Sequence, residues 1–439
     1  MNNLLLFIYL LYIQILPITQ DNNQVAVLAL LLFASIFFSK YKHLNYGQKK
    51  FIPHENGLSI IGLLLWSSII FTAFGSISGQ PGASDYFLLD IIFPVIYIII
   101  FCSDYSYERL KIFNLSFTVA SFIIGVLFLL QLFNFAGGTE FLIKLSEDEN
   151  SQRVATDKDG VIGGLRFIPL YSLSYLTPIT LHFLGDSIGK ISKYENHEIG
   201  FKNLKKEYLL LFVNFFNFNT SILCVFVASR QGLIVGFLVS LISISFLFFS
   251  NARKNMQTHI IRLFTLLFIS GVLISIINGL VGFIKIDYDY FQGFLSKNDQ
   301  DVERIGQLSS LIDSWWKSPI IGHGNGSTSS WIRDLERPWR YELSFFLRLQ
   351  NTGLVGTSVY FTAMGYLCFK LFRKFHKTGD KVFISSLAGL ISLLIADLTN
   401  PYTIRFTVFY YIYYCIWLSM IPDENLMISG KIVRSENKN

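Results

Sequence analysis

The sequence has little charge for its length. Only 15% of its 439 residues are Asp, Glu, Lys or Arg, whereas soluble globular domains contain about 25%. There are only 10 prolines and four cysteines, which excludes collagen-like proteins and disulfide-rich scaffolds. Apolar residues make up 52% of the chain, so a disordered protein is excluded as well. The chain has too little polar surface for a water-soluble domain.

Neither the basic residues nor the cysteines indicate a soluble partner or a metal. The net charge of +6 does not indicate nucleic-acid binding, because Lys and Arg are dispersed among loops between apolar segments. The cysteines lie in or beside apolar runs without metal-ligand spacing, so we expect buried free thiols. They are Cys102, Cys224, Cys368 and Cys415. We find no Gly-x-Ser-x-Gly, His-Glu-x-x-His or P-loop motif, and we expect no metal and no cofactor.

Long apolar runs follow one another along the whole chain. A membrane-spanning helix needs about 20 mostly apolar residues, and about twelve segments fit this length. The segments are 3–19, 24–39, 58–78, 86–102, 113–135, 166–186, 208–228, 231–249, 260–283, 342–369, 382–398 and 403–421. We therefore expect an all-α polytopic membrane protein, with residues 1–439 forming one integral membrane domain.

Lys and Arg are concentrated in alternate loops, which predicts the orientation. If the chain starts inside, these loops face the cytoplasm, as the positive-inside rule requires, and so does the basic tail. The short loops 20–23 and 79–85 on the other side contain neither Lys nor Arg. We therefore expect both termini to face the cytoplasm.

Two of the expected outer loops are long, at 136–165 and 284–341. Loops beyond about 15 residues without secondary structure are usually functional or disordered. The second loop contains a stretch with helical apolar periodicity, Ile305–Trp316, preceded by Asp301 and Glu303. This pattern predicts a short amphipathic helix lying on the outer face of the membrane.

Five arginines map to the outer third of the membrane. Charge at the bilayer centre costs about 2.5 kcal/mol or more, so these side chains need partners. One interpretation is that each guanidinium anchors its helix at the headgroup level. The other is a shared cationic pocket for an anionic group such as a lipid diphosphate, because the planar guanidinium binds phosphate bidentately. The five are Arg166, Arg230, Arg340, Arg348 and Arg405.

A glycine-rich stretch, Ser318–Ser327, follows the expected amphipathic helix. Glycines let a backbone approach a ligand closely, and successive N–H groups can form an anion nest. An ordinary cluster of turns gives the same composition. Within the stretch, His323 can act as a base or donate a hydrogen bond to a phosphate. A single His in a loop more often does neither.

Several motifs occur in an order that resembles the O-antigen polymerase/ligase superfamily of bacterial surface polysaccharide assembly. The resemblance covers roughly residues 160–370. The motifs are Arg166 before a helix containing Pro178, Ser229-Arg230-Gln231-Gly232-Leu233, Arg304 about eleven residues before Trp315, Ser318–Gly326, and Glu342–Gly356 with Arg348 inside it. The ligase branch usually has a His-Asn pair where this chain has Glu342-Leu343, so the resemblance favours the O-antigen polymerase family.

The resemblance implies a metal-independent, inverting glycosyl transfer at the outer face of the bacterial cytoplasmic (inner) membrane, with a fold similar to C-type glycosyltransferases. The donor would be a growing glycan on undecaprenyl diphosphate, and the acceptor a single repeat unit on the same lipid. The implied partners are these lipid-linked glycans and membrane lipids, and a chain-length regulator is left open. Two alternatives are an O-antigen ligase and a lipid-linked oligosaccharide flippase or transporter.

For this reaction we expect Arg230 to stabilise charge on the leaving phosphate and Glu342 to act as general base, with Arg340 orienting it. The alternative for Glu342 is an acid placed at a helix N-terminus by the helix dipole. The other residues expected to bind diphosphate or substrate are Arg166, Arg304, His323, Arg340, Arg348 and Arg405. Trp315, Trp316, Trp331 and Trp339 are expected to stack on sugars or to anchor the chain at the membrane interface.

Overall fold

The computed structural model shows a helical protein over the residues that it describes. These are 2–15, 55–101, 105, 107–132, 170–195, 204–227, 235–239, 298–332, 335, 337–399 and 406–422. They contain helices and turns and no strand, which confirms the all-α expectation for this part of the chain. Five helical segments are long and apolar enough to cross a membrane: Ser59–Ile77, Ala83–Phe101, Glu108–Leu129, Ser344–Thr378 and Lys381–Leu398.

The described helices follow the predicted segments closely, mostly within a few residues at either end. Before residue 230 they are α1 (Asn2–Ile15), α3 (Glu55–Ile77), α4 (Ala83–Phe87), η2 (Leu88–Ile92), α5 (Phe93–Phe101), α6 (Tyr107–Leu132), α8 (Leu170–Glu195) and α9 (Leu204–Val227). After it they are α13 (Asn298–Lys317), α14 (Ser344–Thr378), α15 (Lys381–Thr399) and α16 (Phe406–Met420). The predicted segments 24–39 and 260–283 and the outer loop 136–165 lie outside the described residues, as do all of 231–249 except 235–239.

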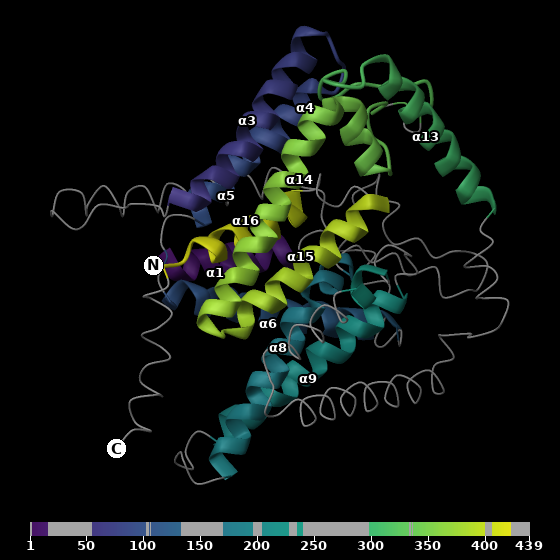
Figure 1. Ribbon diagram of the computed structural model, residues 1–439. Helices are drawn as coiled ribbons and strands as arrows, with labels where there is room; N and C mark the ends of the chain where they lie inside the picture. Colours follow the sequence, from purple (N-terminus) through teal and green to yellow (C-terminus); the bar gives the residue numbers. More distant parts are fainter. Residues whose placement is uncertain are drawn as a thin grey trace.

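The expected amphipathic helix is confirmed as α13. It extends along the upper right of the molecule, next to the first turns of α14 (Figure 1). One part of the span near residue 90 was not predicted: the chain winds there as a π-helix, η2, between α4 and α5. Such π turns are rare and frequently mark functional sites.

The helices pack around an aromatic core centred on α16. This helix is apolar on all sides, as expected of a fully buried helix, and packs against α3, α5, α14 and α15. The ring of Tyr97 from α5 stacks on that of Tyr413 with centroids 5.6 Å apart, and Phe113 from α6 lies 4.8 Å from Trp417. Of the cysteines, Cys415 is a buried free thiol as expected, and Cys368 is free and partly buried.

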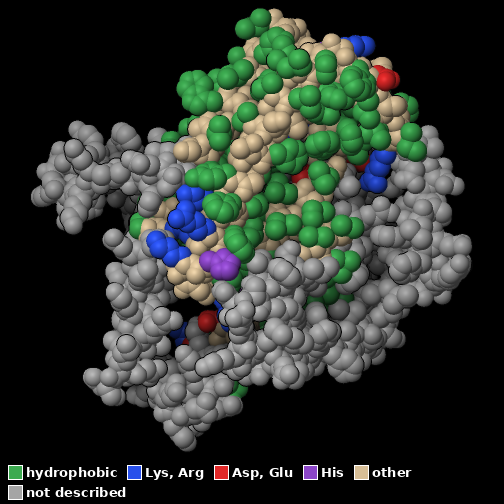
Figure 2. All heavy atoms as spheres, in the orientation of Figure 1, with side chains coloured by type: hydrophobic (Ala, Val, Ile, Leu, Met, Phe, Trp, Pro, Cys, Tyr) green, Lys and Arg blue, Asp and Glu red, His purple; other side chains and the backbone are tan. Residues whose placement is uncertain are grey.

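Large apolar side chains cover much of the outer surface. Figure 2 shows hydrophobic side chains spread over the upper part of the described face. Among the exposed large apolar residues of the described helices are Trp66 on α3 and Phe369 on α14, which are 66% and 55% exposed. Monomeric soluble proteins rarely expose contiguous apolar surface on this scale. Together with the five long apolar helices, this surface identifies a membrane protein.

One break in a helix shapes the site. α14 consists of two helical segments joined at Gly353, whose φ of 60° and ψ of −165° are not helical, and the chain bends sharply there (Figure 1). The glycine-rich stretch packs into this bend, since the N–H groups of Leu354 and Val355 donate to the carbonyls of Pro319 and Ile320. Irregular backbone at membrane depth is tolerated where protein buries it or where it lines a cavity.

Candidate functional site

Five of the eight predicted site residues lie among the described residues, on α13, the glycine-rich stretch and the start of α14. They are Arg304, His323, Arg340, Glu342 and Arg348. The other three lie outside the described residues: Arg166, Arg230 and Arg405. The predicted convergence of all the outer arginines on one pocket therefore stays a prediction.

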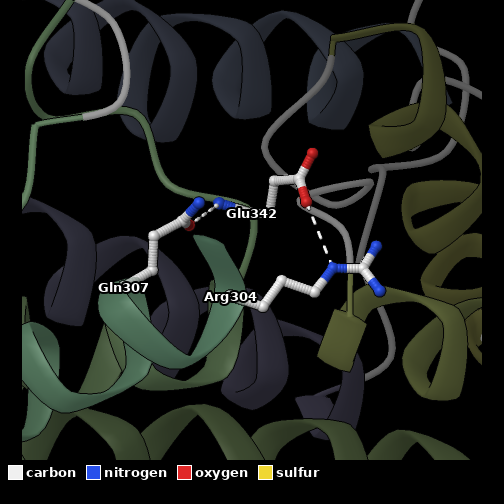
Figure 3. Close-up of polar contacts among 3 residues, drawn as sticks. All are labelled: Arg304, Gln307 and Glu342. Carbon is white, nitrogen blue, oxygen red and sulfur yellow. Dashed lines mark hydrogen bonds and ion pairs between the residues drawn. The ribbon is translucent and has the colours of Figure 1, made fainter. Parts of the chain in front are cut away.

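Glu342 forms an ion pair with Arg304, as Figure 3 shows. Arg304 Nε lies 3.4 Å from Glu342 Oε2, and the two side chains are 26% and 17% exposed. The backbone N–H of Glu342 donates to Gln307 Oε1 at 3.1 Å. Arg304 and Gln307 are three residues apart and so project from the same face of α13. Two contacts from one helix face thus fix Glu342 in place while leaving part of its side chain exposed.

This geometry bears on the two interpretations of Glu342. The N-cap of α14 is Leu343, which makes no side-chain cap hydrogen bond, and the carboxylate of Glu342 is turned toward α13. The side chain therefore links two elements. Placement by the helix dipole stays the alternative interpretation, because Glu342 also lies two residues before the first residue of α14. Arg304, which was not the residue expected to orient this carboxylate, contacts it directly. Arg340 lies in the turn before α14 with an exposed side chain, and its predicted role in orienting Glu342 stays a prediction.

His323 is held in place by hydrogen bonds. Its Nε2 lies 2.7 Å from the carbonyl oxygen of Ser314, so this nitrogen carries a proton and donates it. Its carbonyl oxygen accepts a hydrogen bond from Gln80 Nε2 at 3.3 Å. Since Nε2 is occupied by α13, only Nδ1 could contact a substrate. This arrangement favours the structural interpretation of His323.

The anion-nest interpretation of the glycine-rich stretch is wrong for residues 322–325. All four of their N–H groups donate to backbone carbonyls, so none is directed at a ligand. The acceptors are Ser318, Gln350, Asn351 and Phe71, at N···O distances of 2.9, 3.0, 2.8 and 3.0 Å. The stretch therefore serves to join α13, α14 and α3.

The glycines in this stretch are needed for close backbone approach. Gly322, Gly324 and Gly326 have φ of 69°, 90° and 84°, in the left-handed region that other residues rarely adopt. A Cβ at Gly324 would lie 2.5 Å from Gly75 Cα, on α3. The protein thus uses glycine for contact between its own segments, and that contact places Asn325 against α3.

The four tryptophans differ in their surroundings. The ring of Trp315 packs 4.6 Å from that of Trp316, and its indole N–H donates to the Pro319 carbonyl. Trp316 itself is 64% exposed. Trp331 and Trp339 fill the space beside Gly306 and Gly82, where a Cβ would collide with their rings. Trp316 is thus the most exposed of the four and the one best placed to meet a sugar or the membrane interface.

Sequence reasoning missed one charged residue of this region, Asp90. It lies in η2 and lines a hollow together with Arg348, Asn325 and Tyr86. The signal was present in the sequence, because Asp90 is the one acidic residue in the predicted span 86–102. Ionisable residues within membrane spans are rare and usually functional.

No model of a known protein family matches this chain, and a search of curated proteins finds no matching sequence. The geometry shows a partly exposed carboxylate, Glu342, fixed by a guanidinium at the junction of α13 and α14. It also shows a polar hollow beside the first turns of α14.

Proposed function

We propose that this protein polymerises undecaprenyl-diphosphate-linked oligosaccharide repeat units into a surface polysaccharide, such as O-antigen or capsule. The reaction takes place at the outer face of the bacterial cytoplasmic membrane, in a multi-pass protein with both termini in the cytoplasm. The main support is the Arg304–Glu342 ion pair. These residues belong to two separate motifs of the resemblance, and the fold brings them together.

In this reaction a sugar hydroxyl of the acceptor attacks the anomeric carbon of the donor glycan. The bond from that carbon to the diphosphate oxygen breaks, the new glycosidic bond forms with inversion, and the hydroxyl proton passes to Glu342. A positioned general base contributes about 10²- to 10⁴-fold in rate. Glu342 suits this role because its carboxylate is held in a fixed orientation and stays partly exposed.

Charge develops on the leaving diphosphate, and guanidinium groups stabilise it more in the transition state than in the ground state. We assign this role to Arg230, with Arg166, Arg340 and Arg405 as further contributors. Arg304 acts through Glu342: its contact with Oε2 leaves Oε1 directed away from the guanidinium (Figure 3). Arg304 is thus a positioning residue in this mechanism.

The test is the glycan phenotype of a deletion strain complemented with variants. The wild-type gene should restore a ladder of long chains, and Glu342→Gln should reduce it about 100-fold or more. Asp313→Asn, a matched acid-to-amide change at an exposed position on α13, should restore the full ladder. A full ladder from Glu342→Gln would remove Glu342 from the mechanism.

The same experiment separates the two alternatives. Loss of a polymerase leaves single-repeat glycans outside the cell, whereas loss of a ligase leaves polymer on the lipid carrier. Loss of a flippase leaves no glycan outside at all. The flippase is worth testing because the broken helix α14 lines a polar hollow, an arrangement that also occurs in transporters.

A further inference from the structure

A polar hollow lies between α3, η2, the glycine-rich stretch and the first turns of α14. It is partly open, and the space within it, open solvent included, is about 480 Å³. Five α14 residues that line it recur at helical spacing, so one face of the short segment before Gly353 is directed into the hollow. They are Ser344, Leu347, Arg348, Asn351 and Thr352. Ser67 and Ser68 of α3 also line it.

Asp90 supplies a carboxylate to this hollow from η2. Its Oδ2 accepts a hydrogen bond from Asn325 Nδ2 at 3.3 Å, and the same amide donates to Thr72 Oγ1 on α3 at 3.0 Å. Asn325 is buried, and the glycines on both sides of it fix its position. The carboxylate is thus held by a rigid neighbour, which limits the reorganisation needed to bind a ligand.

Arg348 brings the opposite charge to the same hollow. Its guanidinium carbon lies 3.7 Å from the centroid of the Tyr360 ring, in a cation–π contact. Among the residues that the structure describes, no direct ion pair joins Arg348 to Asp90, although both line the hollow. The two charges attract each other without a direct contact, so groups placed between them can bridge them.

The combination of groups restricts the kind of ligand. A metal cation would be repelled by Arg348, and an isolated anion by Asp90. A neutral molecule with several hydroxyls suits both, because each hydroxyl can donate to the carboxylate or accept from the guanidinium. The serines and the amide add further partners of the same kind.

We propose that this hollow binds a sugar residue of the lipid-linked glycan. The inference rests on the proposed function and extends it, since it names the part of the substrate that the hollow recognises. Arg348 lies four residues after Ser344, about 6 Å along the helix axis, and Glu342 lies just before the same helix. Ser344, two residues after Glu342, lines the hollow, so the hollow and the proposed base are close along the chain.

The test measures binding of two lipids to the full-length protein in nanodiscs. One probe is the lipid-linked repeat unit extracted from the deletion strain, and the other is undecaprenyl diphosphate without sugar. Asp90→Asn should weaken binding of the glycan-bearing lipid about 10-fold, because it loses a charge-assisted hydrogen bond, and should leave the bare carrier unchanged. Asp85→Asn, on α4 and outside the lining, is the matched control and should bind both lipids as the wild type does.

A second variant tests the same inference if Asp90→Asn fails to fold. The double change Ser67→Ala and Ser68→Ala removes two hydroxyls from the lining without altering charge, and alanine is well tolerated in a helix. It should weaken binding of the glycan-bearing lipid several-fold and spare the bare carrier. Unchanged binding in both variants, or equal loss of both lipids, would overturn the inference. The polymer ladder of the wild type is scored separately, so its absence would count against the proposed function instead.

Discussion

Glu342 and Arg304 are 38 residues apart in the sequence and meet at the junction of α13 and α14. A partly exposed ion pair of this kind adds little to stability, about 0 to 1 kcal/mol. Its position matters more, because it fixes the orientation of the carboxylate that we propose as the general base. A structural role and a chemical role for this pair predict different outcomes when the charges are exchanged.

Exchanging the two charges distinguishes a structural role of the ion pair from a chemical one. Arg304→Glu combined with Glu342→Arg keeps an ion pair between α13 and α14 but removes the carboxylate from position 342. We expect protein that folds and inserts like the wild type and makes no long-chain polymer, measured by size-exclusion chromatography and by the glycan ladder. A restored ladder would show that the pair only holds the two helices together.

His323 is expected to tolerate an isosteric amide. In His323→Gln the side-chain NH₂ can replace the Nε2 donor to the Ser314 carbonyl, so the polymer ladder should be unchanged. His323→Phe removes that donor and should lower the free energy of unfolding by about 1 kcal/mol, with activity per folded molecule retained. Thermal unfolding and the glycan ladder measure the two effects. Loss of polymer in a stably folded His323→Gln protein would instead give His323 a role in the chemistry.

At the scale of elements, the bend in α14 determines where the candidate site lies. Gly353 adopts a backbone conformation that is essentially restricted to glycine, and a Cβ there would collide with the Ile320 carbonyl. The backbone of the glycine-rich stretch packs directly against the backbone of the bend. A change in the conformation of either one would therefore disturb the other. This contact holds Asn325 beside Asp90, and both line the hollow together with the first turns of α14.

Gly353→Ala should therefore destabilise the protein by several kcal/mol, or prevent folding, because both the backbone conformation and the contact with Ile320 are lost. Gly365→Ala is the matched control on the same helix, since nothing lies within 4 Å of a Cβ at that position. Alanine there should be neutral, or stabilising by up to about 1 kcal/mol. Thermal unfolding in the same detergent compares the two, and similar melting temperatures would contradict this account of the bend.

Hydropathy could predict the elements but not how they contact one another. The helices α3, α6, α14, α15 and α16 and the amphipathic α13 follow from apolar periodicity, which depends on neighbouring residues alone. The π turn around Asp90 was missed because hydropathy does not distinguish a π turn from the α-helix on either side of it. The acceptors of the glycine-stretch N–H groups were missed because two of them lie on α14 and one on α3, and hydropathy does not predict such contacts between elements. Whether the predicted arginine cluster forms also depends on Arg166, Arg230 and Arg405, which lie outside the described residues.

For the whole molecule, the predicted orientation places the bend at Gly353, next to α13, on the outer side of the membrane. It places the C-terminal end of α14 on the cytoplasmic side. From Leu354 to Thr378 the helix is about 37 Å long, enough to cross a hydrocarbon core of about 30 Å. Lys317 lies close to the bend, because the following Pro319 accepts from the Leu354 N–H. Lys377 lies at the other end of the same helix.

These two lysines provide a matched pair for testing orientation. In a background without native cysteines, Lys317→Cys should react with a membrane-impermeant maleimide in intact cells. Lys377→Cys should react only after the inner membrane is permeabilised. Labelling of Lys377→Cys in intact cells would reverse the orientation and place the candidate site on the cytoplasmic side.

The central claim is that this chain itself joins lipid-linked repeat units, and reconstitution tests it most directly. The purified protein in nanodiscs is mixed with the lipid-linked repeat unit from the deletion strain, and the products are separated by size. The account predicts a ladder of glycans longer than one repeat, released undecaprenyl diphosphate in matching amount, and neither product with Glu342→Gln. Repeat units that remain single in the presence of folded wild-type protein that binds them would contradict it.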